Sequence, residues 1–175
     1  MRIKLLSWLL LLSFNSLAET QLMLNAGYGF QANTEQNNYS YGADISFYRY
    51  DRSPKQALLL GLGYSYLGTD AATNTKLHAI SIFPQLNLYA LPWYGLQPLF
   101  FVRALGPSYL TAKKLGEREQ GKHFAFQAQV GAGFYFGVER SWLATISYKH
   151  FSNANLFEPN DGIDLPFMLT LARRW

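Results

Sequence analysis

The sequence predicts an all-β protein, an eight-stranded antiparallel β-barrel that crosses a membrane with its strands. Charged residues make up only 15% of the 175-residue chain, whereas 17% are aromatic; an ordinary soluble domain has about 25% charged residues. Apolar residues alternate with small or polar ones in segment after segment, which gives each strand one face for hydrocarbon and one for a polar interior. Beyond residues 1–18 there is no apolar run of about 18 residues, which excludes a bundle of membrane-spanning helices.

Residues 1–18 are predicted to be a signal peptide. Two basic residues lie among the first four, an apolar stretch follows at Leu5 to Phe14, and Ser16 to Ala18 form a small-x-small cleavage site. We therefore expect the mature chain to begin at Glu19 and residues 19–175 to form the barrel. The chain contains no cysteine, which excludes a disulfide scaffold, a thiolate zinc site and a cysteine-linked lipid anchor. Export without cysteine suits the bacterial periplasm or outer membrane.

Each predicted strand is a segment with a period of two. The clearest is residues 124–137, where Phe, Ala and Val alternate with Ala, Gln, Gly and Tyr. Pro84 lies inside the fourth segment and predicts a bulge there, and the fifth segment is the least regular. The predicted strands are residues 22–30, 39–47, 58–66, 80–88, 96–109, 124–137, 142–148 and 165–175.

The connections alternate in length in the way that outer-membrane barrels require. Those after the second, fourth and sixth strands are short, and those after the odd-numbered strands are longer and more polar. Short periplasmic turns and long extracellular loops are typical of these barrels, so we expect both termini in the periplasm. Side chains fill the interior of an eight-stranded barrel, which excludes a pore; Arg103 is expected to point inward and pair with Asp44.

The seventh strand departs from its own pattern at its outer end. The outward series through Ile146 and Tyr148 continues to His150 and Ser152, although polar residues are disfavoured on a lipid-facing wall. Residues two apart on a strand share a face, with Cβ atoms about 6 to 7 Å apart. The pair is either an incidental feature of a strand end or a general base beside a nucleophile.

Two short motifs in this region carry a resemblance to a known family. They are His150-Phe151-Ser152-Asn153-Ala154 and Glu158-Pro159-Asn160-Asp161-Gly162-Ile163-Asp164. Together they resemble the signature of the PagL-type lipid A 3-O-deacylases, which are eight-stranded outer-membrane barrels that hydrolyse an ester-linked acyl chain of lipid A. The resemblance implies a serine esterase that removes the 3-hydroxyacyl chain from the 3-position of lipid A.

The resemblance also implies roles for five residues. His150 would be the general base, Ser152 the nucleophile and Asp164 the acid of a catalytic triad. Asn153 and Asn160 match polar positions that support the oxyanion or hold the site together. This chemistry needs no cofactor and no metal, and the expected partners are lipid A or lipopolysaccharide and the outer membrane.

The chain departs from the family pattern at two positions. The acid is typically Glu but here is Asp164, shorter by one methylene, and the Gly that usually follows Asn-Ala is Asn155. Strict alternation with an outward Leu165 would also turn Asp164 inward, so an outward carboxylate needs a bulge near Pro166. Glu158 is the reserve candidate for the acid.

Several alternatives remain open at this point. Basic residues near the outer rim are either phosphate ligands for lipid A or solvated loop charges; they are Lys113, Lys114, Arg118, Lys122, His123 and Lys149. The net charge of +4 does not indicate nucleic-acid binding, because the chain is exported and lacks a basic stripe with stacking aromatics. The protein could instead be a non-catalytic small outer-membrane barrel or a lipase for other acyl esters. A homodimer is also left open.

Overall fold

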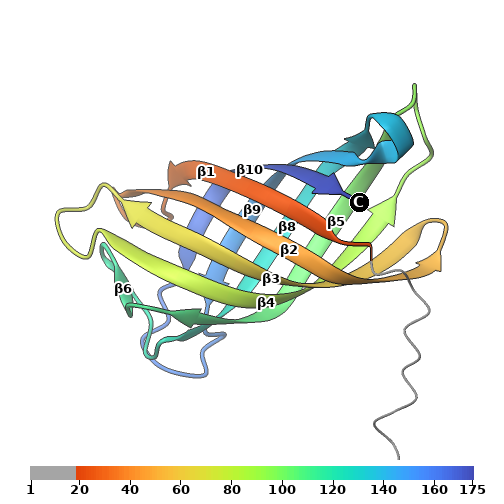
Figure 1. The fold of residues 1–175 in the computed structure, drawn as a ribbon. Helices are drawn as coiled ribbons and strands as arrows, with labels where there is room; N and C mark the ends of the chain where they lie inside the picture. The colour runs from red at the N-terminus through yellow and green to blue at the C-terminus, as the bar shows by residue number, and fades with distance from the viewer. Residues whose placement is uncertain (1–18) are drawn as a thin grey trace, which may run out of the picture.

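The computed structural model describes residues 19–175, so the predicted signal peptide lies outside the described residues. Eight strands form a closed barrel in the order β1-β10-β9-β8-β5-β4-β3-β2, and every neighbouring pair is antiparallel (Figure 1). The strands are β1 (Gln21–Phe30), β2 (Asn37–Ser53), β3 (Gln56–Thr69), β4 (Lys76–Tyr89), β5 (Gln97–Leu110), β8 (Phe124–Phe136), β9 (Trp142–Ser152) and β10 (Ile163–Arg174). A small hairpin of β6 (Lys114–Leu115) and β7 (Arg118–Glu119) lies between β5 and β8, and a short 3-10 helix, η1 (Val138–Arg140), lies between β8 and β9.

The two ends of the barrel differ in their connections. One end, called here the loop end, carries residues 31–36, 70–75, 111–123 and 153–162; the other, the turn end, carries residues 54–55, 90–96 and 137–141. The first strand, β1, begins at the turn end, and the last strand, β10, finishes there (Figure 1). Within residues 19–175, no helix is long and apolar enough to cross a membrane. The periplasmic position of the turn end stays a prediction.

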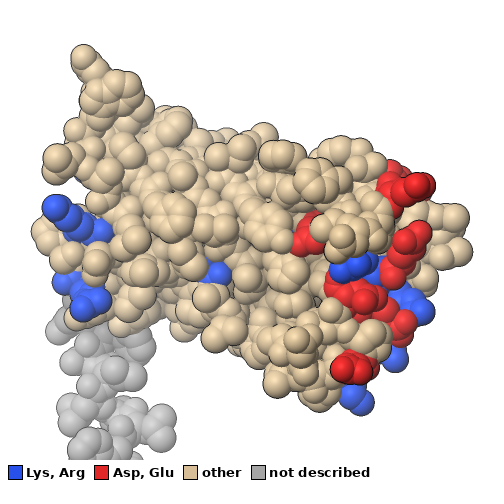
Figure 2. Space-filling view, turned by 180° about the vertical axis from the view of Figure 1, so that it is seen from behind, with Lys and Arg blue, Asp and Glu red and all other residues tan. Residues whose placement is uncertain are grey.

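Alternation along the strands separates an apolar wall from a filled interior. Charged side chains gather at the two ends of the face seen in Figure 2, and the band between them consists mostly of other residues. Inside, an apolar cluster near the loop end includes Leu67 and Phe151, and a second near the turn end includes Phe83 and Tyr135. The interior is therefore packed rather than open.

A buried polar layer lies between the two apolar clusters. Arg103 Nη1 lies 2.5 Å from Asp44 Oδ2, with the side chains 3% and 1% exposed, which confirms the predicted pair. Arg103 Nε also donates to Gln85 Oε1 over 2.6 Å. Because a buried charge is costly unless it is paired and hydrogen-bonded, this contact explains how the barrel holds a guanidinium at its centre.

The fifth predicted strand is irregular, as expected, because β5 carries a bulge. Its register shifts against β4 between Ser81 and Gln85, and against β8 near Leu105, which has a φ of 54°. The β4–β5 register shift spans Pro84, where the sequence predicted a bulge, but the extra residue lies in β5, and the pairing of β4 with β3 shows no shift there. Pro84 suits this position because the β4–β5 pairing is interrupted there, so its missing N–H is tolerated.

Candidate active site

His150 and Asp164 form the centre of the site because β9 and β10 pair them directly. The two residues are register partners, and His150 Nδ1 lies 2.8 Å from Asp164 Oδ1. Phe151, the next residue in β9, is buried inside the barrel, whereas His150 and Ser152 are partly exposed. The alternation of β9 therefore places both polar residues on the outward face, where the sequence predicted them.

A bulge in β10 turns the Asp164 carboxylate outward. The register against β9 shifts between Leu165 and Met168, where three steps along β10 oppose two steps along β9. The irregularity spans Pro166, the position at which an outward Asp164 required it. Leu165 is fully buried, so its predicted outward direction is wrong: the alternation changes phase at the bulge, and only the residues from Phe167 onward follow the predicted face.

Two further side chains donate hydrogen bonds to the Asp164 carboxylate. The Tyr148 hydroxyl donates to Oδ1, and Gln31 Nε2 donates to Oδ2 over 2.6 Å. Both oxygens are thus hydrogen-bonded in the ionised form, and His150 shares Oδ1 with Tyr148. Sequence reasoning missed both residues. Tyr148 had a local signal, since it precedes His150 by two in the outward series, but Gln31 lies 133 positions from Asp164 and had none.

Ser152 lies at the end of β9, on the same face as His150. Its partner across the pairing with β8 is Phe126. Among the described residues, no hydrogen bond joins Ser152 Oγ to His150, an arrangement that is common before substrate binds. Since Nδ1 faces Asp164, Nε2 is the nitrogen of His150 that remains available to accept a proton from a hydroxyl.

Asn153 and Asn160 organise the loop of residues 153–162. The Asn153 backbone N–H donates to Asn160 Oδ1 over 2.8 Å, and Asn153 Nδ2 donates to the carbonyl oxygens of Phe157 and Pro159. Asn160 Nδ2 donates to Asn155 Oδ1 over 2.8 Å. The backbone and side-chain amides of Asn153 therefore hold the loop. The Asn160 NH₂ group has two N–H donors, and within the described chain only one of them is used, in the bond to Asn155. Asn155, which stands where the family pattern has Gly, has a φ of 61°, a left-handed conformation that Asn tolerates better than most residues.

Gly162 lies against the imidazole of His150 and leaves no room for a side chain there. It has a φ of 59°, and a Cβ at this position would lie 2.7 Å from His150 Cε1. Its carbonyl oxygen accepts a 2.9 Å hydrogen bond from Arg118 Nε, which joins the 111–123 loop to the site. Glu158, the reserve acid, is exposed in the 153–162 loop, and the carboxylate that meets His150 is that of Asp164.

The basic residues near the site divide into two groups. Lys149 is 0% exposed, and its Nζ donates to Ser65 Oγ over 3.1 Å inside the barrel, so it is neither a phosphate ligand nor a solvated loop charge, the two alternatives that the sequence left open. The reason is alternation, since its neighbours His150 and Tyr148 face outward. In the 111–123 loop, Lys114 pairs with Glu119 over 2.7 Å, whereas Lys113, Lys122 and His123 are exposed. Within residues 19–175, no group of three or more His, Cys, Asp or Glu residues is arranged to hold a metal ion.

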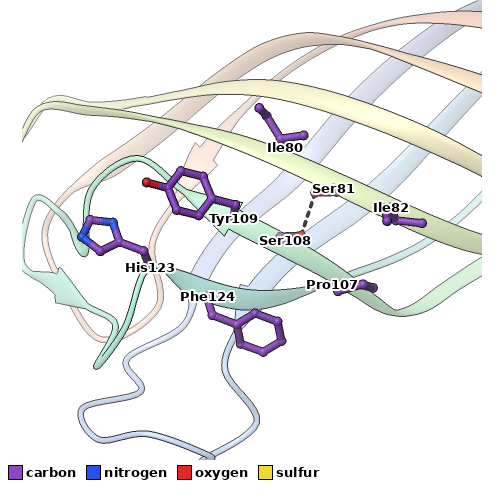
Figure 3. A pocket seen from close by; sticks show the side chains of 8 residues that line it. All are labelled: Ile80, Ser81, Ile82, Pro107, Ser108, Tyr109, His123 and Phe124. Carbon is purple, nitrogen blue, oxygen red and sulfur yellow. Dashed lines mark hydrogen bonds between the residues drawn. The ribbon is translucent and has the colours of Figure 1, made fainter.

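An apolar groove lies on the outer wall beside the site. It has a volume of about 360 Å³ and lies over β4, β5 and the start of β8 (Figure 3). Pro107 in its lining is the register partner of Phe126, which in turn is the partner of Ser152. With strands about 4.8 Å apart, the groove begins about 10 Å from Ser152. Its outward lining consists of Ile80, Ile82, Pro107, Tyr109, His123 and Phe124.

The fold and the site place this chain among closed eight-stranded barrels that carry an imidazole, a carboxylate and a hydroxyl on one outward face, a set of groups that can activate a nucleophile. The family model described as lipid A 3-O-deacylase (PagL) matches residues 39–172. The chain belongs to this family.

Individual relatives agree with this assignment. The chain is 29% identical over 103 residues to the lipid A deacylase PagL of Pseudomonas aeruginosa, covering 58% of this chain and 56% of that protein. It is 26% identical over 105 residues to the lipid A deacylase PagL of Bordetella bronchiseptica, covering 59% and 55%. The alignments thus span about half the length of these curated relatives.

Solved structures share the fold. The crystal structure of the outer membrane enzyme PagL matches with a TM-score of 0.64 at 19% identity, covering 87% of this chain and 98% of that chain. The N-terminal β-barrel domain of Pseudomonas aeruginosa OprF matches with a TM-score of 0.54 at 14% identity, covering 90% and 98%. At these identities the likeness shows the barrel architecture.

Proposed function

We propose that this protein is a lipid A 3-O-deacylase of the bacterial outer membrane. It hydrolyses the ester that links a 3-hydroxyacyl chain to the 3-position of lipid A. The observation that carries the proposal is the 2.8 Å contact between His150 Nδ1 and Asp164 Oδ1 on an outward face that also holds Ser152. Membership of the family supports the choice of lipid A as the substrate.

The location of the site suits a substrate that is itself part of the membrane. With the turn end in the periplasm, the loop end faces the cell exterior, and His150 and Ser152 lie at the depth of the outer leaflet's ester linkages. Lipopolysaccharide occupies that leaflet, so its acyl esters reach the outward wall without leaving the bilayer. An esterase that faced the barrel interior would have no access to such a substrate, because side chains fill that interior.

The reaction proceeds through an acyl-enzyme. Ser152 Oγ attacks the ester carbonyl carbon while His150 Nε2 takes the hydroxyl proton, and Asp164 stabilises the imidazolium through Nδ1. The tetrahedral intermediate collapses, and the sugar oxygen leaves with the proton from His150. Water, activated by the same imidazole, then attacks the acyl-enzyme, releases the 3-hydroxy fatty acid and restores Ser152.

Mass spectrometry of lipid A tests the proposal. The chain and its Ser152→Ala and His150→Asn variants are expressed in a bacterium whose lipid A retains the 3-linked chain. Ser147→Ala is a matched control, because Ser147 lies on the same strand but bonds to Gln129 Nε2 inside the barrel. We expect loss of one primary 3-hydroxyacyl chain with the wild type and the Ser147 variant, and an unchanged spectrum with the other two. Heat-modified gel migration verifies that each barrel is folded.

The same experiment separates the other candidate functions. Deacylation that persists in the folded Ser152→Ala variant contradicts the serine mechanism. An unchanged lipid A spectrum with folded wild-type protein supports a non-catalytic barrel, and accumulation of lysophospholipid supports a lipase for other acyl esters. The acid is identified by comparing Asp164→Ala, which we expect to keep only a small residual rate, with Glu158→Ala, which we expect to be as active as the wild type.

A further inference from the structure

The side-chain amide of Gln31 forms hydrogen bonds with both the carboxylate and the backbone of Asp164. It follows the last residue of β1 and is 1% exposed. Its Nε2 donates to Asp164 Oδ2 over 2.6 Å, and the backbone N–H of Asp164 donates to Gln31 Oε1 over 2.9 Å. One buried amide therefore holds both the side chain and the backbone of Asp164.

Gln31 is itself held by a series of amide groups. Asn38 Nδ2 donates to Gln31 Oε1 over 2.7 Å and lies 3.0 Å from the carbonyl oxygen of Asp164. Gln36 Nε2 donates to Asn38 Oδ1 over 2.9 Å, and the Gln31 backbone N–H donates to the Gln36 carbonyl oxygen over 3.0 Å. Two buried side chains, Gln36 in the loop between β1 and β2 and Asn38 in β2, thus fix the orientation of the Gln31 amide.

The position of Asp164 explains why such support matters. Asp164 lies one residue before the register shift of β10, so the regular pairing ends beside it. The terminal torsion of an Asp side chain has a broad energy profile, so the side chain by itself does not fix the plane of its carboxylate. Because Gln31 binds Oδ2, Oδ1 remains directed at His150 and Tyr148.

We propose that Gln31 is a positioning residue of the deacylase, which orients the Asp164 carboxylate toward His150. This inference rests on the proposed function and adds a residue from the end of β1 to it. Gln31 is buried and acts through Asp164, so its loss affects the rate of the chemical step and leaves substrate binding unchanged.

Steady-state kinetics of Gln31→Ala test the assignment. Hydrolysis of a p-nitrophenyl acyl ester is measured with the folded protein in detergent micelles, and kcat is expressed per Ser152 titrated with a fluorophosphonate probe. We expect kcat to fall about 10- to 100-fold, because a misplacement of about 1 Å has effects of this size, with KM unchanged. Gln21→Ala is the matched control: Gln21 is a glutamine on the same strand, 2% exposed, at the turn end. We expect its kcat to equal that of the wild type.

A double-mutant cycle with Asp164→Ala separates positioning from a general structural effect. If Gln31 acts through Asp164, Gln31→Ala causes no further loss of kcat once the carboxylate is absent. A loss of the same size in both backgrounds, or an unchanged kcat in Gln31→Ala alone, overturns the inference. Hydrolysis that persists in Ser152→Ala, or is absent from folded wild-type protein, instead overturns the proposed function.

Discussion

Replacing Gly162 by Ala should abolish the proposed ester hydrolysis through one added methyl group. Gly162 has a φ of 59°, and a Cβ there would lie 2.7 Å from His150 Cε1 and 3.4 Å from His150 Nε2. Two separate effects therefore follow in Gly162→Ala. The backbone must hold a non-glycine residue in the left-handed region, and the imidazole must move away from the new methyl group.

The sizes of the two effects can be worked out separately. A left-handed conformation costs an alanine about 1 to 2 kcal/mol, which appears in the free energy of unfolding. Carbon atoms in ordinary contact are about 3.5 to 4.0 Å apart, so the imidazole must shift by about 1 Å. A misplacement of this size reduces the rate by about 100-fold, or about 2.7 kcal/mol of activation free energy.

Gly95→Ala provides the control for this experiment. Gly95 has a φ of 78°, and a Cβ at this position would meet no other atom within 4 Å, so the variant reproduces the backbone effect without the contact. Urea unfolding in detergent, followed by tryptophan fluorescence, should show similar destabilisation of both variants. Ester hydrolysis should fall only in Gly162→Ala. Wild-type kcat in Gly162→Ala, or an equal loss of kcat in Gly95→Ala, would refute the reasoning.

Three further predictions concern the interior and the loop. Asp44→Ala leaves the buried guanidinium of Arg103 without its carboxylate partner, so the free energy of unfolding should fall by about 3 to 5 kcal/mol; an unchanged urea midpoint contradicts this. Lys149→Met should leave lipid A hydrolysis unchanged, because Nζ bonds to Ser65 inside the barrel, whereas a raised KM for lipid A would indicate phosphate binding. Asn160→Ala should lower kcat about 100-fold if its free N–H stabilises the oxyanion; a folded variant with full kcat excludes that role.

The barrel was predictable because a strand in a closed sheet has only two faces. Each of the eight predicted segments corresponds to a strand, and the outward direction of His150 followed from counting by two along β9. The ends of the strands were less predictable. β2 continues to Ser53 through a polar segment in which Arg49 pairs with Glu19 and Asp51. Backbone pairing extends beyond the apolar band there, and alternation of hydrophobicity gives no signal for it.

Bulges account for the predictions that failed. A bulge changes the phase of the alternation, so every residue on one side of it is assigned to the wrong face when a single phase is assumed. Leu165 is such a residue, since its strand changes phase near Pro166. Pro84 lies at a register shift, as predicted, but the extra residue is in the neighbouring strand near Leu105. Locating a bulge requires the register of both strands, which a single strand's sequence does not contain.

The residues around Asp164 show why the rest of the site was beyond prediction from local pattern. His150 and Asp164 are 14 positions apart and belong to one hairpin, so a local motif indicates them. Gln31 reaches Asp164 only because β1 pairs with β10 and closes the barrel. The carboxylate therefore obtains the hydrogen bond from Gln31 only when the first and last strands lie side by side. It follows that a barrel with its first and last strands unpaired would retain the His150–Asp164 hairpin but lose the orientation of the acid, and with it most of the rate of hydrolysis.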